Sequence, residues 1–115
     1  MTKASSKAKS SLQVLKEARE LIADEKRWCR GFLAIDASGR RVDSLSKKAA
    51  QWCALGALER ATNKNSHMEL GAFTSLMDCT LGLFGRSIVT VNNEYGHAAI
   101  MKAFDCAISK AESRS

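Results

Sequence analysis

Apolar side chains recur every three or four residues along four stretches of the chain, which is the spacing that buries one face of an α-helix. These stretches predict helices over residues 10–26, 44–62, 66–85 and 92–111. Each follows residues that commonly cap helices, because their side-chain oxygens accept hydrogen bonds from free backbone N–H groups. The candidate caps are Ser10 or Ser11, Ser44 or Ser46, Ser66 with Glu69 as a capping box, and Asn92 or Asn93.

The third and fourth predicted helices each carry an apolar ridge that would face a shared core. The ridge of the third is formed by Leu70, Phe73, Leu76, Met77, Leu81 and Phe84, and Gly85 is expected to end that helix. The ridge of the fourth is formed by Ile100, Met101, Phe104, Ala107, Ile108 and Ala111. The second helix instead carries a stripe of small residues, which would let another backbone approach closely: Ala50, Cys53, Gly56, Ala57 and Ala61.

Two short segments break the helical pattern. Residues 32–35 and 40–42 flank the turn-prone Asp36-Ala37-Ser38-Gly39 and predict a small hairpin, with Gly39 at a positive φ. The β-branched run at 88–91 predicts a short strand. The expected fold class is therefore mainly α (α+β), with about four helices and a small β-hairpin or short β element. We expect a single compact domain over residues 11–115 after a disordered basic tail at 1–10.

Length and composition limit the class of protein. A chain of 115 residues with 45% apolar and 26% charged residues can bury one core, as a soluble globular domain does. No apolar run approaches the roughly 18 residues of a membrane span, and residues 1–7 lack the apolar stretch of a signal peptide. The expected setting is the cytoplasm, or the host cytoplasm if a phage encodes the protein, with no membrane contact.

The cysteines are far apart in the sequence, at Cys29, Cys53, Cys79 and Cys106. Zinc sites and redox dithiols usually take two residues from one tight turn, so no metal is predicted. A reducing cytosol keeps cysteines as thiols, and Cys79 and Cys106 fall in apolar helical patterns as small buried hydrophobes. Glycine-rich nucleotide loops and His-Glu-x-x-His are missing from the sequence, so no cofactor is predicted.

Positive charge is concentrated in two parts of this chain, whose net charge is +6. Residues 1–10 carry three lysines and no acid, and residues 26–48 hold seven basic residues against two aspartates, 7 − 2 = +5. Such clusters track phosphates, so a contact with nucleic acid or an acidic protein surface is expected, the alternative being a solvated face. The expected contact residues are Arg27, Arg30, Arg40, Arg41, Lys47 and Lys48. The neighbouring aromatic residues Trp28 and Phe32 are expected in the core.

Both tryptophans precede a cysteine, in Trp28-Cys29-x-Gly31 and in Trp52-Cys53-x-x-Gly56-Ala57-Leu58. Tryptophan and cysteine are usually buried, which favours a structural role, although a positioned thiol can also be a nucleophile. One asparagine of the pair at 92–93 can accept a hydrogen bond from a free helix-start N–H, while the other ties an adjacent loop. We therefore expect residues 28–31, 52–58 and 91–94 to meet, as a structural junction or as the wall of a ligand pocket.

Together with the Gly39 turn and with Val91-Asn92-Asn93 before an alanine-rich helix, these motifs resemble a bacterial and tailed-phage family of unknown function. The resemblance covers residues 12–112. It implies a small soluble protein and no particular activity, substrate or cofactor. That family commonly has Asn-Asp where this chain has Asn92-Asn93, and the change removes a carboxylate that could act as a general base or metal ligand.

Two other functions stay open. A cysteine-dependent hydrolase or transferase needs a thiol, a histidine and a polar side chain to orient the imidazole, and Cys53, His97 and Asn92 or Asn93 supply these types. The predicted second helix places Cys53 two turns inside, away from the helix N-terminus and in an apolar setting, which favours binding over catalysis. A homo-oligomeric interaction module would instead use leftover apolar surface on the third or fourth helix.

Overall fold

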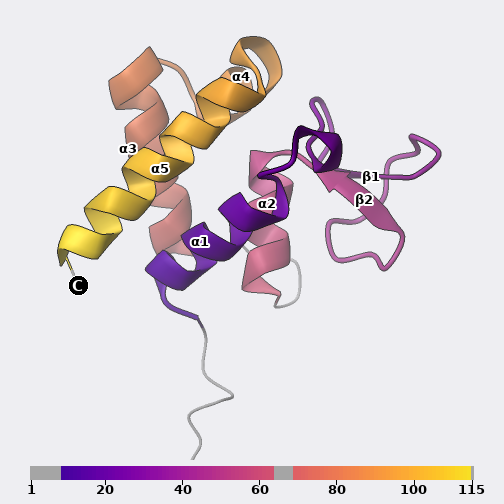
Figure 1. The fold of residues 1–115 in the computed structure, drawn as a ribbon, viewed down its shortest axis with the longest axis horizontal. Helices are drawn as coiled ribbons and strands as arrows, with labels where there is room; N and C mark the ends of the chain where they lie inside the picture. The colour runs from indigo at the N-terminus through magenta and orange to yellow at the C-terminus, as the bar shows by residue number, and fades with distance from the viewer. Residues whose placement is uncertain (1–8, 64–68, 115) are drawn as a thin grey trace, which may run out of the picture.

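The computed structural model describes residues 9–63 and 69–114 of the chain. In these residues four longer helices pack into one bundle, and a two-stranded sheet lies at its side (Figure 1). The elements in chain order are α1 (Ser11–Leu21), the 3-10 helix η2 (Glu25–Arg27), β1 (Ala34–Asp36), β2 (Ala49–Trp52), α2 (Ala54–Thr62), α3 (Leu70–Phe84), the short α4 (Ile88–Thr90), the π-helical turn η3 (Val91–Tyr95) and α5 (His97–Arg114). The expected mainly α fold with a small β element in one compact domain is confirmed.

The core lies where α1, α2, α3 and α5 face one another. Its largest fully buried side chains include Leu15, Ile22, Leu58, Leu76, Ile100 and Phe104. Burying a side chain of this size stabilises the fold by roughly 1.5–3 kcal/mol. Most of these residues lie at the helical spacing from which the sequence predicts a buried face. The ridge predicted for α3 is wrong at its edges, because Leu70 is 74% exposed and Leu81 is 50% exposed. None of the helices in the described residues is both long and apolar enough to cross a bilayer.

Several helix ends follow the predicted chemistry. The Ser10 hydroxyl accepts from the Gln13 N–H at 3.1 Å and caps α1, and Gly85 ends α3 at φ 70°. The Glu69 carboxylate caps α3 by accepting from the Ala72 N–H, whereas its predicted partner Ser66 lies outside the described residues. Most of the predicted basic tail also lies outside them.

The predicted second helix begins too early. Residues 49–52 form β2, which pairs antiparallel with β1, and α2 begins only at Ala54. The Ser46 hydroxyl accepts from the Lys48 N–H and closes a turn instead of capping a helix. Local alanine content favours a helix here, but the open edge of β1 needs a partner, and this pairing outweighs the local preference.

The predicted hairpin is correct at its turn and incomplete beyond it. Gly39 has φ 90°, the Asp36 N–H donates to the Arg40 carbonyl at 2.8 Å, and Val42 N–H donates to the Ala34 carbonyl. The strand that continues the pairing with β1 is β2, and sequence periodicity did not identify it. Residues 24–53, from η2 to the end of β2, project from the bundle and are called the β lobe below (Figure 1).

The strand predicted at 88–91 is wrong. Ser87 caps a helical turn by accepting from the Thr90 N–H, and Ile88 and Val91 are both fully buried, three residues apart, as on one helix face. The start predicted for the last helix is also wrong, because Asn92 and Asn93 lie within η3 and α5 begins at His97. Packing of this face against the core outweighs the β preference of the branched residues.

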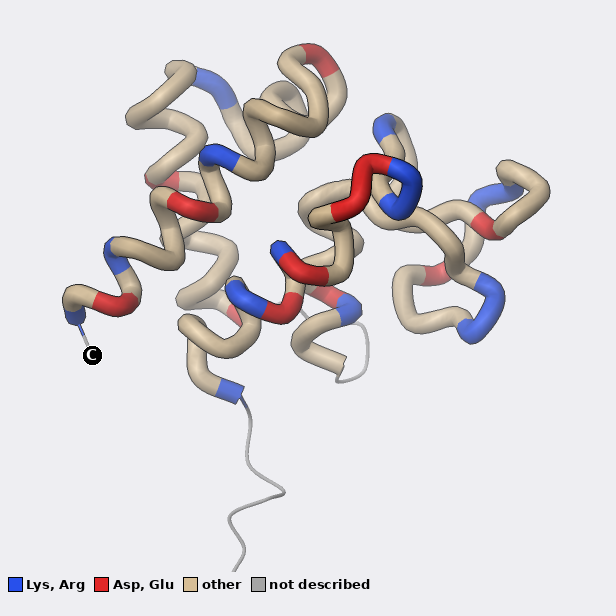
Figure 2. The backbone as a smooth tube through the Cα atoms, in the orientation of Figure 1, with Lys and Arg blue, Asp and Glu red and all other residues tan. Residues whose placement is uncertain are grey.

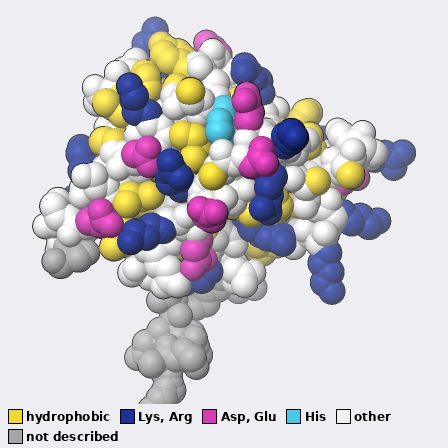
Figure 3. Space-filling view, viewed as in Figure 1, with side chains coloured by type: hydrophobic (Ala, Val, Ile, Leu, Met, Phe, Trp, Pro, Cys, Tyr) yellow, Lys and Arg dark blue, Asp and Glu magenta, His cyan; other side chains and the backbone are white. Residues whose placement is uncertain are grey.

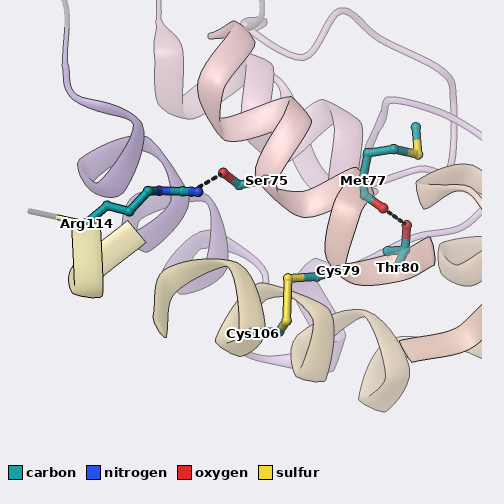
Figure 4. Close-up of a disulfide and its surroundings, with 6 residues drawn as sticks. All are labelled: Ser75, Met77, Cys79, Thr80, Cys106 and Arg114. Atoms are coloured by element: carbon teal, nitrogen blue, oxygen red, sulfur yellow. Dashed lines mark hydrogen bonds between the residues drawn. A yellow bond between two sulfur atoms is a disulfide. The ribbon is translucent and has the colours of Figure 1, made fainter. Parts of the chain in front are cut away.

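A disulfide joins Cys79 of α3 to Cys106 of α5, so the expectation that all cysteines remain thiols is wrong for this pair (Figure 4). The two helices bring the Cα atoms within 6.0 Å, which is inside the range that a disulfide spans. The same interface is tied at its other end by the Arg114 guanidinium, which donates to the Ser75 hydroxyl at 3.2 Å. Sequence reasoning missed the bond because it could not place the two helices side by side.

Candidate functional site

Asn92 lies at a junction of three segments that are distant in sequence. Its Oδ1 accepts from the Trp28 indole N–H at 2.8 Å and from the Ala54 N–H at 3.0 Å. Its Nδ2 donates to the Cys29 carbonyl and to Asn93 Oδ1 at 3.1 and 2.9 Å. The side chain is 1% exposed, and all of its hydrogen-bonding capacity is used. The expected meeting of residues 28–31, 52–58 and 91–94 is therefore confirmed.

Asn93 ties the loop at 28–31 more tightly to η3. Its Oδ1 accepts from the Gly31 N–H at 2.9 Å, and its backbone carbonyl accepts from Arg30 Nη1 at 2.8 Å. The π-helical turn makes both contacts possible, since the extra residue in the turn presents two successive asparagines to the loop. Asn92 accepts from the first N–H of α2 and Asn93 fixes the loop, so the two predicted roles are present, but at the start of α2 and not of the last helix as predicted.

The small-residue stripe permits a close approach at one position. A Cβ atom on Gly56 would lie 1.8 Å from the Leu33 carbonyl oxygen, so only glycine fits where the loop before β1 crosses α2. The Cys53 N–H donates to the same carbonyl at 3.3 Å. Ala50 and Cys53 do not share this helix face, because they precede α2.

A cavity of about 150 Å³ lies between this loop, α2 and α4. Its apolar wall is formed by Phe32, Leu33, Leu55, Ile88 and Val89. Gly31, Asn92 and Asn93 line the side nearest the junction, and Cys53 completes the wall. The sequence located the asparagines and the cysteine, but it offered no signal that the three elements leave a hollow between them.

Cys53 stands at the N-terminus of α2, so the prediction that it lies two turns inside a helix is wrong. Its thiol accepts from the Gly56 N–H at 3.4 Å and caps the helix. Despite this position, burial raises the pKa of Cys53, and burial raises the pKa of Cys29 to about 11. Both side chains are less than a tenth exposed, at 8% and 7%, and both thiols stay neutral near pH 7.

His97 contacts a backbone carbonyl and an aromatic ring. Its Nε2 lies 2.7 Å from the Ile22 carbonyl, and its ring packs edge-on against Trp28 with centroids 5.5 Å apart. Within the described residues no hydrogen bond joins His97 to Cys53. The two residues are therefore each engaged with backbone groups, and the proposed thiol and imidazole pair is not assembled here.

The β lobe carries all six basic residues that the sequence selected. Arg27, Arg30, Arg40, Arg41, Lys47 and Lys48 are exposed, and they follow the lobe from η2 to the loop before β2 (Figure 2). Figure 3 shows lysine and arginine side chains extending into solvent at the lobe's end of the molecule. In the described part of the chain none of the six forms a salt bridge, since the recorded pairs are Lys9–Glu17, Lys16–Glu112 and Arg19–Asp105.

The acids of the lobe are engaged by backbone groups. Asp24 accepts from the Lys26 N–H, and Asp43 accepts from the Leu45 N–H. Asp36 accepts from the Ser38 hydroxyl and from the N–H groups of Ser38 and Arg40, and these bonds, the hydroxyl's first, lower the pKa of Asp36. These carboxylates shape turns and remain charged, and with Glu25 they leave residues 24–53 with seven basic residues against four acids, 7 − 4 = +3.

Three arginines of the lobe stack on aromatic rings. Arg30 lies 5.0 Å from the Trp28 ring centroid, Arg27 lies 5.7 Å from that of Trp52, and Arg41 lies 5.6 Å from that of Phe32. The tryptophans are buried, as expected, but the core position expected for Phe32 is wrong, because it is 45% exposed. Stacking holds a guanidinium flat on the ring while its N–H edges stay available to an anion.

Metal ligands are not gathered at this site. Among residues 9–63 and 69–114, no group of three or more histidine, cysteine or acidic side chains is placed to hold a metal ion. The arrangement combines a lobe of net positive charge, an apolar cavity and neutral thiols.

The chain matches the family of unknown function DUF6197 over residues 7–110 and belongs to that family. Membership of a family without an assigned function was expected, whereas a bacterial or phage origin stays a prediction. No curated protein and no solved structure matches the chain.

Proposed function

We propose that this protein is a binding module that contacts nucleic acid through the β lobe. The observation that supports the proposal is the set of six exposed basic side chains without salt bridges among the described residues. Phosphate contacts by such side chains release counterions, so affinity depends steeply on salt. In the setting we infer, it is an accessory protein of a bacterium or phage.

Fluorescence anisotropy with labelled random-sequence duplex and single-stranded DNA tests this proposal. Binding is expected at low salt, with log K falling linearly with log salt at a slope near −0.9 for each phosphate contact on duplex. No binding at tens of micromolar protein, or binding that salt does not weaken, would contradict it. Binding to an acidic protein such as poly-glutamate but not to DNA would redirect the proposal to an acidic protein partner.

A matched pair of double variants locates the contact. Lys47→Glu with Lys48→Glu changes the charge of the lobe by four units, and we expect affinity to fall at least about tenfold and the salt slope to shrink by about 2. Lys102→Glu with Lys110→Glu makes the same change in charge on exposed positions of α5. If the α5 pair weakens binding as much as the lobe pair, net charge alone is responsible and the lobe is not the contact surface.

A thiol-dependent hydrolase or transferase is the alternative, and one observation favours it: Cys53 stands at a helix N-terminus and lines a cavity. The raised pKa of the thiol and the engagement of His97 by Ile22 weigh against it. Iodoacetamide labelling of the native protein at pH 7 distinguishes the two. Cys53 should react no faster than Cys29 if the protein only binds, and much faster if it is a nucleophile.

A homo-oligomeric module is the third reading, supported by Leu81 and Leu83 on α3, which are 50% and 46% exposed. Its test is the hydrodynamic mass across a range of protein concentrations. The cytoplasmic setting is also a proposal, and the redox state of Cys79 and Cys106 in cells tests it, because a reducing compartment disfavours disulfides.

A further inference from the structure

The cavity beside Asn92 is lined mainly by apolar side chains, and most of the polar atoms near it are already hydrogen-bonded, Asn93 Nδ2 being a remaining donor. Asn92 makes four hydrogen bonds within the junction, and Asn93 Oδ1 already accepts two. Cys53 is a neutral thiol and behaves as a small apolar group. The remaining wall is formed by the aliphatic and aromatic side chains of the loop, α2 and α4. The part of a ligand that fills the cavity is therefore expected to be apolar.

The size of the cavity limits the apolar group that fits. Its volume is about 150 Å³, and an apolar cavity of roughly this volume in another protein holds a benzene molecule. A six-membered ring or a chain of about six carbons is of the same size. Burying such a chain would contribute about 0.8 kcal/mol for each CH₂ group, which suffices for weak but specific binding.

Two arginines stand against residues of the cavity wall. Arg30 donates to the Asn93 carbonyl at 2.8 Å, and the Arg41 guanidinium lies 5.6 Å from the ring centroid of Phe32. Both arginines are exposed, and in the part of the chain that the structure describes neither forms a salt bridge. Two positively charged side chains thus lie next to residues of the cavity wall.

We propose that this cavity binds a small monocarboxylic acid whose apolar body, of about six carbons, fills the cavity while its carboxylate lies in the mouth near Arg30 and Arg41. The site adjoins the proposed nucleic-acid contact and shares these two arginines with it. A ligand with the opposite charge would place an ammonium group beside the guanidinium groups, and a ligand without the apolar body would leave the cavity unfilled.

Titration of the ¹⁵N-labelled full chain with hexanoate, hexylamine and acetate, followed by amide chemical shifts, tests the proposal. Hexanoate should shift the amides of Leu33, Leu55 and Val89 and bind at least about tenfold more tightly than hexylamine, which is the effect of about 1.4 kcal/mol of charge interaction. Acetate should bind about two hundredfold more weakly, because four CH₂ groups are missing. Equal binding of hexylamine or acetate would overturn the proposal, as would the absence of shifts at these amides.

Substitutions test the apolar cavity and the charged arginines of the site one at a time. Val89→Trp should fill the cavity and abolish hexanoate binding, since Val89 is 49% exposed and a larger side chain there need not disturb the core. Arg41→Gln should weaken hexanoate about threefold, and the control Arg86→Gln, an exposed site at the end of α3, should leave it unchanged.

A second readout remains if Val89→Trp fails to fold. Hexanoate should slow alkylation of Cys53 by N-ethylmaleimide in the wild-type chain, because the thiol lines the same cavity. Unchanged alkylation at saturating hexanoate would overturn the proposal. Binding of a short apolar peptide in place of hexanoate would also overturn it and would assign the cavity to a partner's side chain.

Discussion

At the scale of single residues, the asparagine pair Asn92 and Asn93 makes most of the contacts that hold the candidate site together. Sequence reasoning expected one asparagine at a helix start and the other on a neighbouring loop, and both contacts are present. It misplaced the helix, because the capped one is α2 and not the helix that follows. Cys53 was misjudged for a related reason: its position relative to the helix start depends on β2, which no local pattern revealed.

The two asparagines should differ in their tolerance of aspartate. Asn92→Asp removes the Nδ2 donor and buries a charge, so the free energy of unfolding should fall by about 3 kcal/mol. Asn93→Asp is its matched control, because both hydrogen bonds of that side chain are accepted by Oδ1, and the change should be within about 1 kcal/mol. Urea unfolding of both variants measures this. Equal losses would contradict the assigned amide roles.

The buried thiol of Cys29 should make the protein less stable in alkali. Burial raises the pKa of Cys29 from 9.0 to about 11, so the folded chain keeps a proton that the unfolded chain releases. Its contribution to stability is fully present below pH 9 and is lost as the pH rises from 9 to 11. Urea unfolding from pH 8 to 10.5 should show a shallower decline for Cys29→Ala than for the wild type. Parallel declines would count against the prediction.

At the scale of elements, caps and ridges were predictable and strand pairings were not. The start of α1, the Gly85 end of α3 and the buried face of α5 follow from residues three or four apart. The pairing of β1 with β2 joins segments separated by a long loop, and the turn of η3 packs against a different loop, at residues 28–31. Neither the strand pairing nor the η3 turn produces a periodic pattern of apolar residues along the sequence. Because these elements build the candidate site, the sequence could predict only that three segments meet there.

The loop before β1 crosses α2 at Gly56, and this contact can be tested with Gly82 of α3 as a control. Gly56→Ala would place a methyl group on the Leu33 carbonyl, so the free energy of unfolding should fall by about 2 kcal/mol. Gly82→Ala in α3 meets nothing within 4 Å and should raise it by about 0.5–1 kcal/mol through helix propensity. Thermal unfolding of both variants is the measurement. A stabilised Gly56→Ala variant would show that the loop does not lie on α2.

The link between α3 and α5 should contribute measurably to stability. Closing a loop with a sequence separation of 27 residues stabilises a folded chain by about 3 kcal/mol in the chain-entropy account. Cys79→Ala with Cys106→Ala should lose about this amount in urea unfolding, and dithiothreitol should weaken the wild type but not the double variant. A reductant effect of the same size in both would mean that the disulfide is not its target.

At the scale of the whole molecule, the bundle contains most of the buried core, and the β lobe carries the exposed basic residues. The mainly helical class followed from the sequence, since most residues lie in strongly periodic segments. The projection of the β lobe from the bundle did not, although the clustering of charge in residues 26–48 anticipated that this part would be cationic. The cavity lies where the two parts meet.

The two proposed ligands should therefore be separable by substitution. Lys47→Glu with Lys48→Glu should weaken DNA and leave hexanoate affinity unchanged, because neither lysine lines the cavity. Val89→Trp should do the reverse. Anisotropy and amide shifts measured on both variants check the pattern. Loss of both activities in either variant would indicate a single composite site or a damaged fold.

The asparagine junction also constrains how this chain can change over time. Two of the four partners of Asn92 are main-chain atoms, of Ala54 and Cys29, which persist whatever side chains those positions carry. The other two belong to Trp28 and Asn93 and can be replaced. A related chain that replaces Asn92 must then also replace Trp28, whose indole would lose its acceptor. These two positions should therefore change together or both stay the same.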